Sequence, residues 1–564
     1  MGSSTINASS LGLTGTSFGL GQGINVQSVV QALTTAAQAG ESVYTNEQNL
    51  YNSQISDLQS VSSLLSNLEL ATQTLQDPAG PLAARTTSSS NPGVLTATAS
   101  SGISTGSYSV TVNSLASTST YISLAQKDGT TSIGTGSIQY EINGKQYEID
   151  VNAANNDTTL NSLASYINNN AASFGVTAAV INGANGATLT LTSQTSGTAG
   201  EITNMTDNLG LGLGLQNSAI SSVQSSSTAT VGDGSINYTI GGTNYEIDVN
   251  GDNGNETLDT LASYINTNSA DLGGVSANVV TDTQGSYLTL TSSSGAITKL
   301  SDSTGLNMSS YNSEAVAGQD ASLTVNGVTV PQSSNTVTGV IPGLTFSLLG
   351  ASTSPVTITV SQDVTQATTA INNFVSAYNA VANAMNTEFT YTAGSSSQPP
   401  LFSDSSLEQV QSTLATDINY FIQGNNGING LASLGINLQQ DGTLSVDSAT
   451  LTAALTNNAA AVQNFFQGAD YVSGFGGQLY NDVNKLNDPT NGPLALDLQG
   501  IDQELQDVTK TISDFNANLL VQQQQWTAEY SQVSATLEQL PSLLQQAGSQ
   551  VASTSSSTSS SSSG

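Results

Sequence analysis

Residues 163–168 read LASYIN, and residues 261–266 read LASYIN again. Two further words recur in the same order, YEIDVN at 147–152 and 245–250 and LTLTS at 189–193 and 288–292. The second copy has one additional residue, in a loop where LGG at 272–274 takes the place of FG at 174–175. Loops are where folded units tolerate insertions. The sequence therefore predicts two copies of one folded module.

The repeated word belongs to a helix in each copy. Apolar residues there follow helical spacing, at Leu160, Leu163, Ala164 and Ile167 and at Leu258, Leu261, Ala262 and Ile265. Such a stripe is buried against other elements of a domain. We therefore interpret LASYIN as a packing element rather than a duplicated active or binding site. Each module is predicted to be ββαββ-like, with a polar turn before its helix.

The polar turn of the second copy resembles a calcium loop only in part. Asp248, Asn250, Asp252 and Gly254 supply oxygen ligands and a glycine, but Asn253 stands where an EF-hand needs its invariant Gly. The matching turn of the first copy lacks the spacing. We predict an ordinary acidic turn that caps a helix, and no metal site.

The modules are enclosed by a wider β-rich region, residues 85–361. β-branched residues alternate with polar ones on both sides of the repeat, for example at 108–112 and 356–360. Gly-rich turns separate these runs. This region is predicted to be a β-rich head.

Helical patterns dominate both ends of the chain. Near the N-terminus, Val26, Val29, Val30 and Leu33 lie on one helical face, whereas residues 1–25 are expected to be disordered in the free protein. A second helix follows and should end at Asp77-Pro78, since proline cannot continue it.

The C-terminal region carries a heptad pattern. Apolar residues recur every seventh position, at Leu505, Ile512, Leu519, Trp526, Val533 and Leu540. The second seam position turns polar at Gln522, Glu529 and Thr536, so this helix should complete its packing only with a partner. The helix is expected to end near Pro541. The candidate partner and oligomer contacts are Val26, Val29, Val30, Leu33, Leu519, Trp526, Val533 and Leu540. The alternative is that these residues only close an intramolecular bundle.

Composition excludes several classes of protein. The chain has no Cys and no His, which removes thiol nucleophiles, His-based triads and most zinc or copper sites. With 40 acidic and 6 basic residues, its formal charge of −34 argues against binding nucleic acid. No apolar run is long enough for membrane insertion, and the N-terminus does not read as a cleaved signal peptide. We predict no catalytic residues, no cofactor and no enzyme activity.

The order of these segments resembles one family. The segments GLGQGINVQSVVQAL near the N-terminus, NPGVLTATASSGISTGSYSVTVNSLA, GQDASLTVNGVTVPQSSNTVTGVIPGLTFSLLG and LASLGINLQQDGTLSVDSATLTAALTNNAAAVQNFF resemble the flagellar filament cap proteins, the hook-associated protein 2 family. The repeats resemble flagellin-hook IN modules, named for Ile167-Asn168 and Ile265-Asn266.

The resemblance implies an α+β multidomain fold, with N- and C-terminal helices in a coiled-coil or bundle leg and a β-rich head. The expected segments are a terminal segment 1–40, a leg helix 41–84, a first β part 85–126, IN-type modules 127–225 and 226–315, a β return 316–361, a helical leg 362–480, a coiled-coil helix 481–547 and a disordered Ser-rich tail 548–564.

The resemblance also implies a function outside the cell, at the filament tip. The chain would form a ring-shaped homo-oligomer that promotes flagellin polymerisation and prevents loss of flagellin monomers. Its partners would be itself, flagellin, the hook-filament junction proteins, and the type III export apparatus with its chaperone.

Two alternatives come from other classes. A non-flagellar surface adhesin or surface-layer protein would also combine β modules with a helical stalk, and adhesion through the head could coexist with capping. A polysaccharide-active enzyme could use Asp/Glu pairs, but only 5% of residues are aromatic and no aromatic-lined cleft is evident.

The low content of basic residues suggests an acidic habitat.

Overall fold

The computed structural model describes residues 25–282, 285–391, 398–470 and 473–556. The chain divides into two compact units, one formed by residues up to Ala84 together with those from Gln362 onward, and the other by Arg85–Ser361. We call them the leg and the head. The predicted α+β multidomain class, with helical ends and a β-rich middle, is confirmed.

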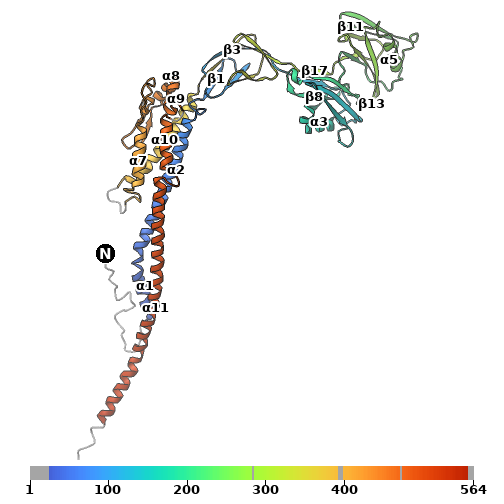
Figure 1. The fold of residues 1–564 in the computed structure, drawn as a ribbon. Coiled ribbons are helices and arrows are strands. Elements are labelled where there is room, and N and C mark those ends of the chain that lie inside the picture. Colours follow the sequence, from blue (N-terminus) through green and yellow to red (C-terminus); the bar gives the residue numbers. More distant parts are fainter. Residues whose placement is uncertain (1–24, 283–284, 392–397, 471–472, 557–564) are drawn as a thin grey trace, which may run out of the picture. The chain divides into compact units, whose positions relative to one another are not determined.

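The leg is mainly helical. Its elements are α1 (Val26–Gln38), α2 (Glu41–Gln76), α6 (Val364–Phe389), α7 (Ser405–Ile418), β23 (Ile436–Leu438), β24 (Leu444–Val446), α8 (Ser448–Asn457), α9 (Ala459–Gln467), α10 (Phe475–Leu486) and α11 (Pro493–Ser556). The end of α2 falls at Asp77-Pro78, as predicted. Figure 1 shows α2 running alongside α11.

An aromatic cluster fills the core of the leg. Phe475 is fully buried, and its ring centre lies 5.5 Å from that of Phe465, 5.6 Å from Phe374 and 5.7 Å from Phe466. Leu58, Leu65, Leu68 and Leu75 line the buried face of α2 against this core. Contacts between α2, α6, α9 and α10 thus tie together segments that are far apart in the sequence.

The β domain of the head joins the outgoing and returning parts of the chain. Its strands are β1 (Arg85–Ser89), β2 (Leu95–Ala99), β3 (Gly106–Ser114), β18 (Ala321–Val325), β19 (Val328–Gln332), β20 (Thr336–Ile341), β21 (Leu344–Leu348) and β22 (Val356–Gln362). They form sheets in the orders β1-β22-β3-β18-β19 and β2-β21-β20. Because β3 pairs with β18 and β22, neither half of this domain can close its sheets alone.

The two modules share one topology. Module 1 contains β4 (Thr118–Ile122), β5 (Gly136–Ile142), β6 (Lys145–Val151), α3 (Leu160–Asn169), α4 (Ala171–Phe174), β7 (Val176–Gly183), β8 (Gly186–Ser196), β9 (Ile202–Asp207) and β17 (Glu314–Val316). Module 2 contains β10 (Ser218–Ile220), β11 (Gly234–Ile240), β12 (Thr243–Val249), α5 (Leu258–Thr267), β13 (Val275–Asp282), β14 (Gly285–Ser292), β15 (Thr298–Asp302) and β16 (Ser309–Tyr311).

Each module has more strands than the repeat predicts. Its sheets follow the orders β6-β5-β9 and β17-β4-β8-β7 in module 1, and β12-β11-β15 and β13-β14-β10-β16 in module 2. The expected starts at 127 and 226 therefore exclude β4 and β10, which pair with β8 and β14. These short strands join the sheets by long-range pairing, which local periodicity does not encode.

The LASYIN helices pack as predicted. Leu160, Leu163, Ala164 and Ile167 are buried in module 1, and Leu258, Leu261, Ala262 and Ile265 in module 2. Tyr166 and Tyr264 pack beside the two stripes, half-buried. The LASYIN motif is therefore a packing element in both modules.

The asparagine that ends each LASYIN motif does not belong to the apolar stripe and instead forms hydrogen bonds to a strand. The Asn168 side chain donates to the Ala178 carbonyl at 2.7 Å and accepts the Ala178 N–H at 2.9 Å. Asn266 makes the same two bonds with Ala277, both at 2.7 Å. Because β7 and β13 are edge strands, the amides pair backbone groups that the sheets leave open. We call this pair of bonds the Asn clamp.

The C-terminal helix differs from its predicted bounds. It begins at Pro493 rather than 481, and it continues through Pro541 instead of ending there. Leu, Gln and Ala after Pro541 favour a helix, so their propensity offsets the lost N–H of one proline. Residues 548–556, predicted to be disordered, are helical, whereas 557–564 and the N-terminal 1–24 lie outside the described residues.

Candidate functional site

The candidate site is the paired chain ends, α1 and α2 against α11. Asn25 caps α1, since its Oδ1 accepts the Ser28 N–H at 3.1 Å. Val29 and Val30 are then buried, with 6% and 5% of their surfaces exposed, and Val26 and Leu33 are half-buried. The predicted apolar face of α1 is thus the face that packs, and α11 contacts this helix.

Polar bonds hold α2 against α11. The Asn516 side chain donates to Glu41 Oε1 at 2.7 Å, and Gln48 donates to Thr509 Oγ1 at 3.0 Å. Between them, the rings of Tyr44 and Phe515 lie 6.4 Å apart. Across the described ranges, the ion pairs in this structure join residues of one helix, Lys485 to Asp482 and Lys510 to Asp514. The contact between the ends therefore depends on apolar packing and on hydrogen bonds donated by side-chain amides. Dissolved salt weakens these interactions less than it weakens ion pairs.

The buried face of α11 drifts away from the predicted heptad. Leu519 is buried, and Trp526 and Leu540 are half-buried, in agreement with the predicted seam. Val533 is 43% exposed, and its neighbour Ser534 is buried instead, so the seam position predicted for Val533 is wrong. A helix with 3.6 residues per turn drifts about 20° per heptad from a strict seven-residue repeat. Over the two heptads beyond Leu519 the drift amounts to about 40°, and it moves Val533 out of the seam and Ser534 toward it, although by less than the roughly 100° that separates successive residues.

Further apolar side chains on these helices face outward. They are Val43, Leu50 and Leu70 on α2, and Leu496, Leu520, Val521, Val533, Leu543, Leu544 and Val551 on α11, each at least 43% exposed. Sequence reasoning selected only Val533 among them, because the others lie off the heptad. Exposed apolar residues mark a surface that binds a partner where they form a contiguous patch.

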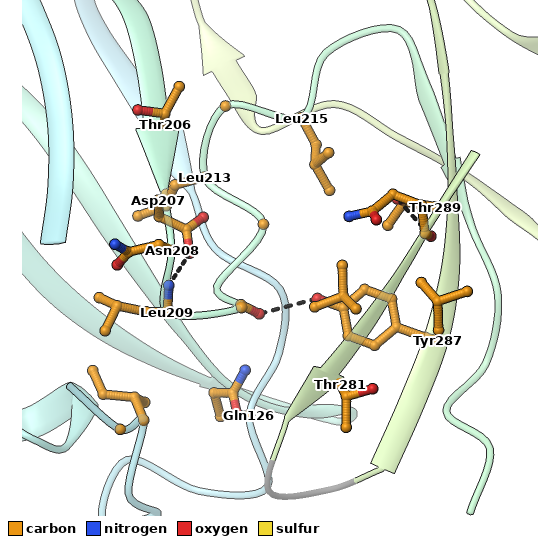
Figure 2. A pocket seen from close by; sticks show the side chains of 18 of the residues that line it. Gln126, Thr206, Asp207, Asn208, Leu209, Leu213, Leu215, Thr281, Tyr287 and Thr289 are labelled. Carbon is orange, nitrogen blue, oxygen red and sulfur yellow. Dashed lines mark hydrogen bonds between the residues drawn. The ribbon is translucent and has the colours of Figure 1, made fainter. Parts of the chain in front are cut away.

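The head contains a cavity of about 710 Å³ between its modules (Figure 2). Asp207 lies in its wall and accepts the Leu209 and Leu211 N–H groups at 3.0 and 2.9 Å. Tyr287 crosses from module 2 and donates to the Gly210 carbonyl at 3.0 Å. Burial raises the pKa of Asp207, but its oxygens already serve the turn. Asp207 is the single carboxyl among the described residues that line the cavity, and its neighbours there are mainly amide, hydroxyl and apolar side chains.

Other kinds of site find no support in the described ranges. No group of three or more His, Cys, Asp or Glu residues there could hold a metal ion. No helix there has the length and apolar character needed to cross a membrane.

These features define a class of structural assembly protein, in which paired helical ends carry a β-rich insert. Residues 22–119 match the family model for the flagellar hook-associated protein 2 N-terminus, and residues 318–542 match the model for its C-terminus. The chain belongs to the flagellar hook-associated protein 2 family. Apart from the first two residues of β4, both modules lie in the segment between the two matches.

Individual members of this family are similar to the chain in sequence. The chain is 26% identical over 365 residues to the B-type flagellar hook-associated protein 2 of Pseudomonas aeruginosa, covering 57% of this chain and 76% of that one. It is 29% identical over 259 residues to the Salmonella typhimurium hook-associated protein 2, covering 41% and 53%. The latter match therefore spans about half of the Salmonella protein.

The fold also has a solved counterpart. A crystal structure of the D1-D2-D3 domains of the Escherichia coli flagellar cap protein FliD aligns with a TM-score of 0.50 at 23% identity. The alignment covers 79% of this chain and 99% of that one.

Proposed function

We propose that this protein is the structural cap at the distal tip of a bacterial flagellar filament, where it promotes ordered addition of exported flagellin and prevents loss of monomers. The observation that carries this proposal is the joint match of both chain ends to the hook-associated protein 2 family, together with their pairing as α1, α2 and α11. The same observation favours a cap over a surface adhesin.

The outward apolar residues of α2 and α11 support assembly with other chains. Burial of apolar surface is worth about 25 cal/mol per Å², so several valines and leucines covered together stabilise a contact substantially. We propose that these residues meet neighbouring copies of this chain in a ring, or flagellin subunits. The predicted contacts Val26, Val29, Val30, Leu33, Leu519, Trp526 and Leu540 then mainly hold the ends together, whereas Val533 meets a partner.

The remaining steps of the proposal concern location and export. The protein would act outside the cell, next to the hook-filament junction proteins before flagellin is added. It would reach this place unfolded through the type III export channel, with a chaperone. The absence of Cys suits this route, because no disulfide must form or break. The work of the cap is binding and steric gating, with no covalent chemistry.

Deletion of the gene tests the function. The mutant should lack full-length filaments and release flagellin monomer into the medium, and the intact gene supplied in trans should restore both. The cap proposal would be refuted if the mutant built full-length filaments and released no flagellin monomer.

A further inference from the structure

Three buried carboxyl oxygens have no hydrogen-bond donor. In the described ranges they are Asp157 Oδ2, Glu314 Oε1 and Asp417 Oδ2. They come from module 1, from strand β17 and from helix α7 of the leg. A buried ionised oxygen without a donor is costly, whereas a protonated carboxyl turns the same atom into a donor.

The internal repeat provides a template for Asp157. In module 2 the matching residue is Asn255, whose Oδ1 accepts the Asn250 N–H at 2.9 Å and whose amide donates to the Asp248 carbonyl at 2.8 Å. Asp157 keeps the first bond, since its Oδ1 accepts the Asn152 N–H at 2.7 Å. The second bond requires a donor. Only a protonated Asp157 reproduces what Asn255 does.

Asp157 is fully buried, as is Asn255. The charged group that faces it is Asp150, which disfavours a second negative charge. No cationic side chain offsets this pair. The surroundings of Asp157 therefore suit a neutral amide side chain such as that of Asn255, but the residue there is a carboxylic acid.

Asp417 lies on α7, with 4% of its surface exposed, and faces Asp482 of α10. Lys485 of α10 binds Asp482 Oδ1 at 2.7 Å, so this single cation already has a partner. Gln478 of α10 also lies near the pair, and Tyr378 of α6 lies near Asp417. One lysine cannot neutralise two carboxylates.

Glu314 faces Glu201, which precedes β9. Gln216 donates to Glu314 Oε2 at 3.2 Å and to the Tyr121 hydroxyl oxygen at 2.7 Å. Tyr121 is buried and donates to the Ile202 carbonyl at 3.2 Å. Glu314 Oε1 therefore has a second carboxyl beside it and no cation.

We propose that Asp157, Glu314 and Asp417 bind protons in the folded chain, so that the fold is more stable in a mildly acidic medium than in an alkaline one. The protons satisfy the three oxygens and remove repulsion within each carboxyl pair. A chain with 40 acidic and 6 basic residues also gains from every charge it sheds.

The direction of the pKa shifts agrees with the geometry. Burial raises the pKa of Asp157, and burial with Glu201 nearby raises the pKa of Glu314. Burial, with Asp482 next, raises the pKa of Asp417 to about 7. A folded-state pKa above the unfolded one contributes stability that is complete below the unfolded pKa and is lost as pH rises through the folded pKa. The stability that Asp417 contributes is therefore lost progressively as pH rises from about 4, the ordinary pKa of an aspartate, through about 7.

Other carboxyls set the lower limit of this window. Hydrogen bonds from Thr130 lower the pKa of Asp128 to about 2, and the pKa of Asp441 is lowered in the same way by Thr443. These groups contribute stability that is lost only in stronger acid. Near pH 5 and near pH 8 both groups are ionised, so neither contributes to a difference in stability between these two conditions.

Two measurements on the full chain test the proposal. The infrared absorption of protonated carboxyl groups should be present near pH 6 and weaker in a variant that combines Asp157→Asn, Glu314→Gln and Asp417→Asn. In urea unfolding, the wild-type folding equilibrium constant should be at least about tenfold larger near pH 5 than near pH 8, since one unit of pKa shift corresponds to about tenfold. The triple variant should show a smaller difference, and the remainder should come from other buried carboxyls with raised pKa values, such as Asp207 and Asp497.

Single variants keep the test decisive if the triple variant fails to fold. Asn255→Asp should introduce new pH dependence into module 2, and the exposed Asp128→Asn should leave the difference between pH 5 and pH 8 unchanged. The proposal is overturned if the wild-type chain shows no protonated-carboxyl absorption near pH 6, or if it is equally stable near pH 5 and pH 8.

Discussion

Replacing Asn168 by Ala should open the edge of module 1. The substitution removes both bonds of the Asn clamp to Ala178 and leaves an N–H and a carbonyl of β7 without their partners. Each hydrogen bond contributes about 0.5–1.5 kcal/mol net. Because Asn168 is exposed and water can replace it, we expect the lower part of the combined range, about 1–2 kcal/mol.

Hydrogen exchange followed by mass spectrometry measures this effect strand by strand. A loss of 1–2 kcal/mol corresponds to a factor of about 5–30 in the opening equilibrium, so amides of β7 and α3 should exchange faster by that factor. Module 2 should keep its exchange rates, and Asn266→Ala should give the reciprocal result.

Asn169→Ala is the matched control, because this exposed neighbour on the same helix does not form the clamp. Equal protection of β7 in Asn168→Ala and Asn169→Ala would refute the clamp. So would equal loss in both modules.

Three further predictions concern the leg. Phe475→Ala should destabilise it by about 3–5 kcal/mol, since a fully buried ring leaves the aromatic cluster, and the urea midpoint followed by circular dichroism should fall. Pro541→Ala should stabilise the distal part of α11 locally by up to about 3 kcal/mol, seen as slower amide exchange beyond residue 537. Val533→Ser should change stability by less than about 0.5 kcal/mol yet reduce swimming motility, whereas Leu519→Ala should cost about 2 kcal/mol of stability. Unchanged motility in Val533→Ser would remove Val533 from the partner surface.

The sequence predicts the packing of the modules well and their boundaries poorly. The stripe in LASYIN follows from helical periodicity, so its burial was accessible from spacing alone. The pairing of β4 with β8 could not be predicted from spacing, because these strands lie far apart in the sequence. The clamp was also missed, since a side-chain bond from Asn168 to the backbone of Ala178 leaves no periodic signal.

The chain ends show the same division. Spacing identified Val29, Val30 and Leu519 as buried residues, because each lies on an apolar stripe. It failed at Val533, which lies off the buried face of α11 while its neighbour Ser534 lies on it. It failed again at Pro541, where a single residue with low propensity is outweighed by good helix formers around it.

The most direct test of the cap proposal is the position of the protein on the filament. Gold-labelled antibody against the head should mark the distal tips of intact filaments in electron micrographs and leave their sides bare. Label along the filament, or on the cell body with bare tips, would contradict the proposal.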